Sequence, residues 1–231
     1  MKKLLTIVFF MVLAMAPMTG SAYIINDLTN DAIGTRTFES YGINVYNLTP
    51  GVNSGAIAFD LFTNYPASGL LVGTWNTQPA DFFLTETYYG NQYLWGIPLV
   101  AHDGLSAGTM YAVNSILTSD SFEPAGGGYL YNHDVPVRIG TIGNNYGYAS
   151  FGGGSITWNP TGGTSPDWRI RVTTGIYEDD PNGSFSYHWG TATCANDVVS
   201  SPVPEPATML LLGTGLIGLA GFFRRQKNLK S

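Results

Sequence analysis

Two stretches of the chain alternate regularly between apolar and polar residues, one within residues 167–177 and one within residues 184–193. The apolar positions are Trp168, Ile170, Val172 and Ile176 in the first stretch and Phe185, Tyr187 and Trp189 in the second. A period of two is typical of half-buried antiparallel strands. We therefore predict that two inner faces are buried together, one with Trp168, Ile170 and Val172 and the other with Phe185, Tyr187 and Trp189. The segment between the stretches, residues 178–183, should then form the tip of a hairpin.

Shorter apolar runs predict further strands. They lie at residues 56–62, 70–75, 81–87, 92–100, 109–117, 135–139, 146–151 and 155–158. Turn sequences rich in glycine, proline, asparagine and aspartate separate them, for example Asp103-Gly104. Many short strands at this spacing indicate an all-β fold, and we predict an antiparallel β-sandwich or jelly roll over residues 23–199.

The N-terminal segment has the pattern of a secretory signal peptide. Lys2 and Lys3 precede an apolar run over residues 4–16, and the small residues Gly20 and Ala22 follow it. This order of a basic, an apolar and a small-residue region predicts a signal peptide at residues 1–22, cleaved between Ala22 and Tyr23. The alternative is an uncleaved membrane anchor. Either way, the segment after residue 22 is exported.

The C-terminal segment, residues 200–231, contains a second apolar stretch. Residues 200–206 include three prolines and form a linker, and residues 207–223 carry no charge. Seventeen uncharged residues are just long enough to span a bilayer as a helix. Arg224 and Arg225 follow directly, and basic residues next to a membrane span favour the cytoplasmic side. We therefore expect a membrane-anchored precursor with its C-terminus in the cytoplasm and its main domain outside.

This C-terminal pattern closely resembles the PEP-CTERM sorting signal. Pro204, Glu205 and Pro206 precede the apolar helix, and the basic pair Arg224-Arg225 follows it. The resemblance implies that Pro204, Glu205 and Pro206 are recognised by exosortase, a membrane-embedded transpeptidase-like enzyme. It also implies a Gram-negative source that makes exopolysaccharide and grows in biofilms or flocs. The precursor would then be anchored in the inner membrane with its main domain in the periplasm, and its final location would be the cell surface or outside the cell. The mature protein is then either attached or released.

The central domain is similar to other exosortase-dependent surface proteins in three short segments. These are residues 102–111, residues 168–170 and the Cys-Ala-Asn-Asp turn at residues 194–197. The resemblance implies a shared β-rich domain and brings no activity with it.

Charge excludes one class of partner. Residues 23–203 contain four arginines, no lysine and fifteen carboxylates, which gives this stretch a net charge of −11. Nucleic-acid binding needs clustered lysine and arginine to neutralise phosphates, so we exclude it. Cations, neutral polymers and basic molecules remain compatible with this charge as binding partners. Cys194 is the single cysteine of the chain, so no intrachain disulfide can form.

Catalytic patterns are weak. The sequence has neither a Gly-x-Ser-x-Gly elbow nor a His-Glu-x-x-His zinc motif. His102-Asp103 and His133-Asp134 each place an imidazole beside a carboxylate, but neighbours on a strand point to opposite faces, so we expect turn residues there. His188 falls on the polar face of its strand, either solvated or facing a ligand. We expect Cys194 to be a small buried residue. The sequence therefore predicts a protein that is not an enzyme.

Two groups of residues are candidates for binding. Glu178, Asp179, Asp180 and Asn182 offer oxygen ligands within one short segment, so weak Ca²⁺ binding is weighed there against a plain solvated turn. Aromatic residues in glycine-rich surroundings could stack on sugars, although most aromatic residues should belong to the core. These are Tyr88, Tyr89, Tyr146 and Tyr148.

We therefore predict an exported, exosortase-processed surface or matrix protein with a structural or binding role in exopolysaccharide. The alternatives are a carbohydrate-binding module for that polymer and, more remotely, a secreted hydrolase. Two carboxylates facing each other across a cleft would favour the hydrolase.

Overall fold

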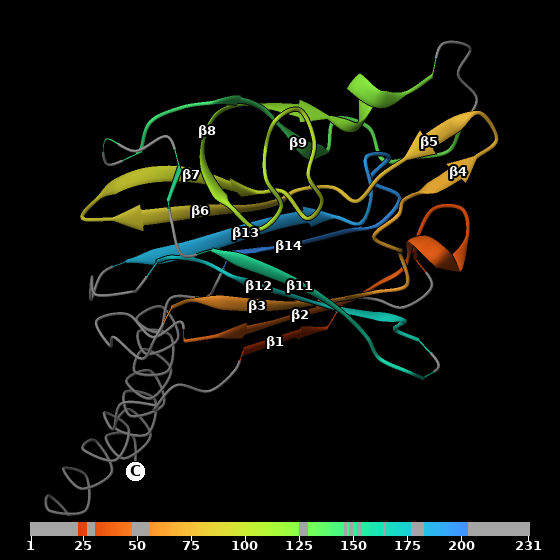
Figure 1. Cartoon of the computed structure of the whole chain (residues 1–231), viewed down its shortest axis with the longest axis horizontal. Coiled ribbons are helices and arrows are strands. Elements are labelled where there is room, and N and C mark those ends of the chain that lie inside the picture. The colour runs from red at the N-terminus through yellow and green to blue at the C-terminus, as the bar shows by residue number, and fades with distance from the viewer. Residues whose placement is uncertain are drawn as a thin grey trace, which may run out of the picture.

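The computed structural model describes residues 23–26, 31–47, 56–124, 129–145, 147, 150–151, 154–163, 165–176 and 183–202. These residues form antiparallel sheets with almost no helix, which confirms the prediction of an all-β, antiparallel fold (Figure 1). Within this described part, no helix is both long and apolar enough to span a bilayer. The predicted signal peptide and the apolar segment at residues 207–223 lie outside the described residues.

The first sheet has five strands in the spatial order β1-β2-β3-β12-β11. In that order the strands span Tyr23–Asn26, Ser40–Tyr46, Ala58–Thr63, Trp168–Thr173 and Ser155–Pro160. Every pairing between these neighbours is antiparallel. Strand β12 therefore pairs with β3, more than a hundred residues earlier in the chain, and with β11.

The second sheet has seven strands, six of them in the spatial order β10-β8-β7-β6-β13-β14, with β9 paired to β8. In the order of that path the six strands span Ser150–Phe151, Met110–Thr118, Asn91–Ile97, Phe82–Tyr88, Ser184–Gly190 and Val198–Pro202. Strand β9 spans Pro136–Ile142. Four shorter elements complete the described chain: strands β4 (Leu70–Val72) and β5 (Trp75–Thr77), which pair with each other, and the 3₁₀ turns η1 (Arg36–Phe38) and η2 (Ser119–Phe122).

One hydrophobic core joins the facing sides of the two sheets. Alternate residues of β2, β3 and β12 meet alternate residues of β6, β7 and β13. The largest fully buried side chains among them are Trp95, Trp189, Phe59 and Phe82. Buried Trp95 keeps its indole N–H paired, because it donates to Glu86 Oε2 at 2.9 Å. Burial of this apolar surface is the main force that holds the sheets together.

The prediction for the two strongly alternating strands is confirmed for five of the six named side chains. Ile170, Val172, Phe185, Tyr187 and Trp189 share this core. Trp168 differs, because it is only half-buried at the start of β12, where its ring meets that of Trp158 edge-on at 6.0 Å.

The prediction of a hairpin tip at residues 178–183 is wrong. Strand β12, before this segment, belongs to the five-stranded sheet, whereas β13, after it, pairs with β6 and β14 in the other sheet. The strands before and after this segment therefore belong to different sheets and do not pair with each other. Strand β14 runs through Pro202, so the first three residues that the sequence assigned to the linker are paired with β13.

Strands β8 and β9 lie on the side of the seven-stranded sheet that faces away from the five-stranded sheet (Figure 1). A smaller hydrophobic core lies on this outer face. Strand β8 pairs with β7 and β10 through residues 110–112, and its later residues pair with β9 across several register shifts. Such irregularities bend a strand. The β8–β9 hairpin packs its Val113 and Ile139 with Phe83 of β6, so part of the outer face is covered too.

Candidate functional site

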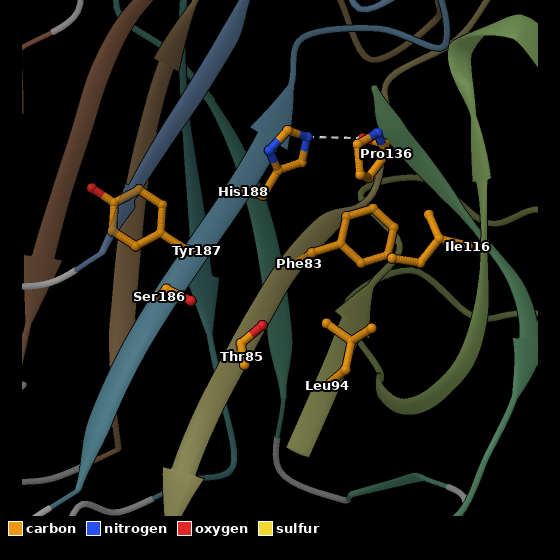
Figure 2. Close-up of a pocket in the computed structure, with 8 residues that line it drawn as sticks. All are labelled: Phe83, Thr85, Leu94, Ile116, Pro136, Ser186, Tyr187 and His188. Atoms are coloured by element: carbon orange, nitrogen blue, oxygen red, sulfur yellow. Dashed lines mark hydrogen bonds between the residues drawn. The ribbon is translucent and has the colours of Figure 1, made fainter. Parts of the chain in front are cut away.

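A pocket of about 250 Å³ opens on this outer face, between the strands of the sheet and the β8–β9 hairpin (Figure 2). Strands β6, β7 and β13 supply its floor, and Ile116 of β8 and Pro136 of β9 supply its wall. The lining residues are Phe83, Thr85, Leu94, Ile116, Pro136, Ser186, Tyr187 and His188. Figure 2 shows the ring of Tyr187 on the other side of β13, so this residue contributes to the core rather than to the pocket surface.

Strand register builds the floor of the pocket. In β6, Phe82 and Leu84 face the main core, so Phe83 and Thr85 face outward. The pairing of β6 with β13 sets Thr85 opposite Ser186 and Phe83 opposite His188. The pairing with β7 sets Leu94 opposite Thr85 on the other side. The floor therefore consists of Leu94, Thr85 and Ser186 in a row, beside the rings of Phe83 and His188.

His188 is held in one orientation at the edge of the pocket. Its Nε2 lies 3.0 Å from the carbonyl oxygen of Pro136, and its Nδ1 lies 2.6 Å from Oγ of Ser200 on β14. A carbonyl only accepts, so Nε2 carries the proton and Nδ1 accepts from the serine hydroxyl. Burial lowers the pKa of His188 below its ordinary value, although the bond to Pro136 acts in the opposite direction. The imidazole is therefore neutral at pH 7.

A second polar cluster fixes the loop after β7. His102 Nε2 lies 2.8 Å from Oδ1 of Asp81, and its Nδ1 lies 3.1 Å from Oδ2 of Asp103. Asp81 also accepts the backbone N–H of Ile139 on β9, and Arg138 reaches Asp103 at 3.6 Å. Both His102 and Asp81 have buried side chains.

The prediction that His102-Asp103 belongs to a turn is confirmed, since Asp103 has a positive φ of 48°. The turn geometry also brings the two side chains together, which the opposite faces of a strand would have prevented. His133 instead pairs with Asp120 at 2.8 Å on the surface.

Cys194 is buried, as predicted, beside aromatic residues of a separate cluster. Burial raises the pKa of its thiol to about 12. The thiolate is the nucleophilic form of cysteine, so this residue is inert as a nucleophile at neutral pH.

The remaining candidate residues fall into two groups. Tyr88 and Tyr89 lie at the β6–β7 turn with their rings edge-on at 4.6 Å, and Tyr89 is 67% exposed. Tyr23 is the first residue of β1. The others lie outside the described residues: Ala22, Tyr146, Tyr148, Glu178, Asp179, Asp180, Asn182, Pro204, Glu205, Pro206, Arg224 and Arg225.

Reasoning from the sequence missed the pocket residues apart from His188. A signal for them exists in residues 82–84, Phe-Phe-Leu, where the alternation breaks. An unbroken apolar run in a strand indicates that both faces of the strand are covered. The structure also groups three carboxylates that the sequence separates widely, those of Asp31, Glu39 and Asp197.

Comparison with known protein families gives a match that begins at the last residue of the folded domain. Residues 202–225 match the family model of the PEP-CTERM protein-sorting motif. The chain carries a PEP-CTERM sorting signal. The PEP-CTERM motif confirms the resemblance seen in the sequence, and it makes the protein an exported exosortase substrate with a membrane-anchored precursor that is processed to the cell surface. No curated protein and no solved structure matches the chain.

Proposed function

We propose that the domain is a non-enzymatic, saccharide-binding β-sandwich of the bacterial surface, and that the outer-face pocket holds a sugar unit of an exopolysaccharide in the biofilm matrix. The observation that carries the proposal is the composition of this pocket. A phenyl ring, a leucine, an isoleucine and a proline line it together with two hydroxyl groups and an imidazole. Binding sites for small molecules are mostly apolar with a few placed polar groups, and this pocket has that balance.

Size and chemistry favour a single sugar ring. A volume of about 250 Å³ lies below the range of about 300–1,000 Å³ for drug-sized ligands, so one ring fits better than several. A pyranose presents an apolar C–H face, which suits Phe83 and Leu94. Its hydroxyl groups suit the side chains of Thr85 and Ser186, which lie opposite each other on β6 and β13.

The pocket favours binding over hydrolysis. Glycosidases generally use two carboxyl groups on either side of the scissile bond, at about 5–10 Å from each other. No aspartate or glutamate is among the residues that line this pocket. The chemistry of the lining therefore supports recognition of a sugar without cleavage of its bonds.

The net charge of the domain favours neutral polysaccharides over acidic ones as ligands. With a net charge of −11 over residues 23–203, the domain repels polyanionic chains at low ionic strength. The pocket lining itself holds no arginine or lysine that would pair with a uronate or sulfate group. We therefore propose a neutral polysaccharide as the ligand.

The test is a binding assay with the full-length chain in detergent on an array of neutral and acidic glycans. Thr85→Trp fills the pocket from its floor and should abolish binding to neutral glycans. Thr157→Trp is the matched control, because Thr157 is an exposed strand residue on the other sheet, in β11. Tyr89→Ala should reduce binding if the sugar chain extends to the β6–β7 turn. Equal binding by the wild type and Thr85→Trp would contradict the assignment of the pocket.

A further inference from the structure

Three carboxylates that are far apart in the sequence converge at one end of the fold. Asp31 lies in the loop after β1, Glu39 follows η1 at the start of β2, and Asp197 precedes β14. One ligand oxygen from each lies within 4.8 Å of the others. Asp31 is exposed, whereas Glu39 is 1% and Asp197 5% exposed. Buried carboxylates at such distances repel one another unless a proton or a cation compensates.

Asp197 is held as a ready-made ligand. Its Oδ2 accepts the backbone N–H of Ser40 at 2.5 Å, and its Oδ1 accepts that of Val198 at 2.8 Å. Hydrogen bonds of this kind favour the ionised form of a carboxyl group. They also leave lone pairs on both oxygens, because a carboxylate offers about four acceptor sites. The charge of Asp197 is thus fixed in place beside Glu39.

A buried side-chain oxygen on the residue just before Asp197 has no hydrogen-bond partner. Asn196 is 6% exposed, and its Oδ1 is buried without a hydrogen bond. Its side chain is directed to the loop that carries Asp31, since Nδ2 donates to the carbonyl oxygen of Ile33 at 2.5 Å. The N–H of Ile33 donates in return to the backbone oxygen of Asn196 at 2.7 Å. The unpaired amide oxygen therefore lies in the contact between the segments of Asp31 and Asp197.

We propose that Asp31, Glu39 and Asp197, with Oδ1 of Asn196, form a Ca²⁺ site that ties the start of β2 to the start of β14. Calcium takes six to eight oxygen ligands at 2.3–2.6 Å, and two oxygens that share one ion lie up to about 5 Å from each other. The 4.8 Å span of the three carboxylates fits one ion between them. An amide oxygen and three carboxylates are the hard ligands that Ca²⁺ prefers.

This site is distinct from the acidic segment at residues 178–182, and it joins the two sheets, because β2 and β14 belong to different ones. Affinity should fall in the range of about 10⁻⁴–10⁻³ M that is usual for extracellular modules. Since an ion that binds the folded state alone stabilises it, Ca²⁺ should raise the melting temperature.

The experiment is a thermal melt of the full-length chain in detergent, with EDTA and then with ~10 mM CaCl₂. Asp31→Asn removes the negative charge of the exposed ligand and should leave the fold intact, yet it should weaken Ca²⁺ binding about tenfold or more. Asp167→Asn removes one exposed charge elsewhere and should keep the full Ca²⁺ response. Asp180→Asn tests the acidic segment in the same way.

The melting temperatures of the variants distinguish the proposed site from the acidic segment. A Ca²⁺-induced rise in melting temperature that Asp31→Asn lowers, and that Asp167→Asn and Asp180→Asn preserve, supports the site. No rise in the wild type, or a rise lost only in Asp180→Asn, would overturn it. Calorimetric titration with CaCl₂ gives the affinity independently, and MgCl₂ in place of CaCl₂ should give a weaker response because Mg²⁺ requires stricter octahedral geometry.

Discussion

Gly96 offers a sharp test of the way in which the β8–β9 hairpin covers the sheet. Gly96 is a buried residue of β7, and a Cβ atom added to it would lie 2.6 Å from Cγ1 and 2.8 Å from Cδ1 of Ile139, and 3.0 Å from Cγ2 of Val113. Contacts this short force the hairpin to shift. Overpacking of a filled core typically costs 1–3 kcal/mol, so we expect Gly96→Ala to lower the free energy of unfolding by roughly 2 kcal/mol.

A double-mutant cycle with Ile139 isolates this contact. Ile139→Ala alone should cost about 2–5 kcal/mol because it opens a cavity. In the double variant the added methyl group occupies part of that cavity, so the total loss should be smaller than the sum of the two single losses by about 1–3 kcal/mol. Gly163→Ala is the control, since nothing lies within 4 Å of a Cβ there, and its effect should be small or slightly stabilising.

Urea titration followed by tryptophan fluorescence measures these differences, with Trp95 next to the substituted position. Strict additivity in the cycle, or a Gly96→Ala variant as stable as the wild type, would mean that β9 does not lie over β7. The pocket would then lose its wall, because Pro136 and Ile116 belong to the same hairpin.

Three further predictions concern other parts of the chain. The pKa of His188 is lowered in the folded state, whereas in the unfolded state it has its ordinary value of about 6.5. Between these two values the unfolded state binds more protons than the folded state. The melting temperature should therefore fall as the pH drops through and below about 6.5. His188→Gln should flatten that part of the pH profile, and an unchanged slope would count against the assignment. Trp168→Ala should cost clearly less than the 3–5 kcal/mol of a buried aromatic residue, whereas Ile170→Ala in the core should cost about 2–5 kcal/mol in the same urea titration. Residues 200–231 fused to a secreted reporter should be processed in an exosortase-positive host, and Glu205→Ala should block that processing on an immunoblot, whereas normal processing would remove Glu205 from the recognition motif.

The alternating pattern predicts strands well and their partners poorly. It identified β12 and β13 because each has one face in the core and one outside, so apolar and polar residues must alternate. It said nothing about register between distant segments, and the hairpin expected between these strands was wrong for that reason. Strand β2 was missed because Gly42 and Asn44 weaken its β signal, although Ile43 and Val45 are fully buried in the core.

The candidate sites show the same limit. Residues close in sequence, such as Tyr88 and Tyr89, could be proposed as a pair, and the structure places their rings together. The pocket and the carboxylate cluster are made by residues that meet only through sheet pairing and loop contacts. Asp31 and Asp197, for example, are separated by more than 160 positions, so no local pattern relates them.

If the apolar stretch from residue 207 anchors the precursor in the membrane, as the sequence predicts, the end of β14 limits how far the folded domain can stand from the membrane. Pro202 is the last residue paired with β13 and also the first residue of the PEP-CTERM match. Five residue steps separate it from Ala207, where the apolar stretch begins, and a fully extended chain covers about 18 Å over that length. This reach is shorter than the diameter of a small domain, about 30 Å. In such a precursor, exosortase would work in a gap narrower than the folded domain of its substrate. Release of β14 from β13 would lengthen the tether by five residues, or about another 18 Å. The rate of processing would then depend on how stably β14 pairs with β13.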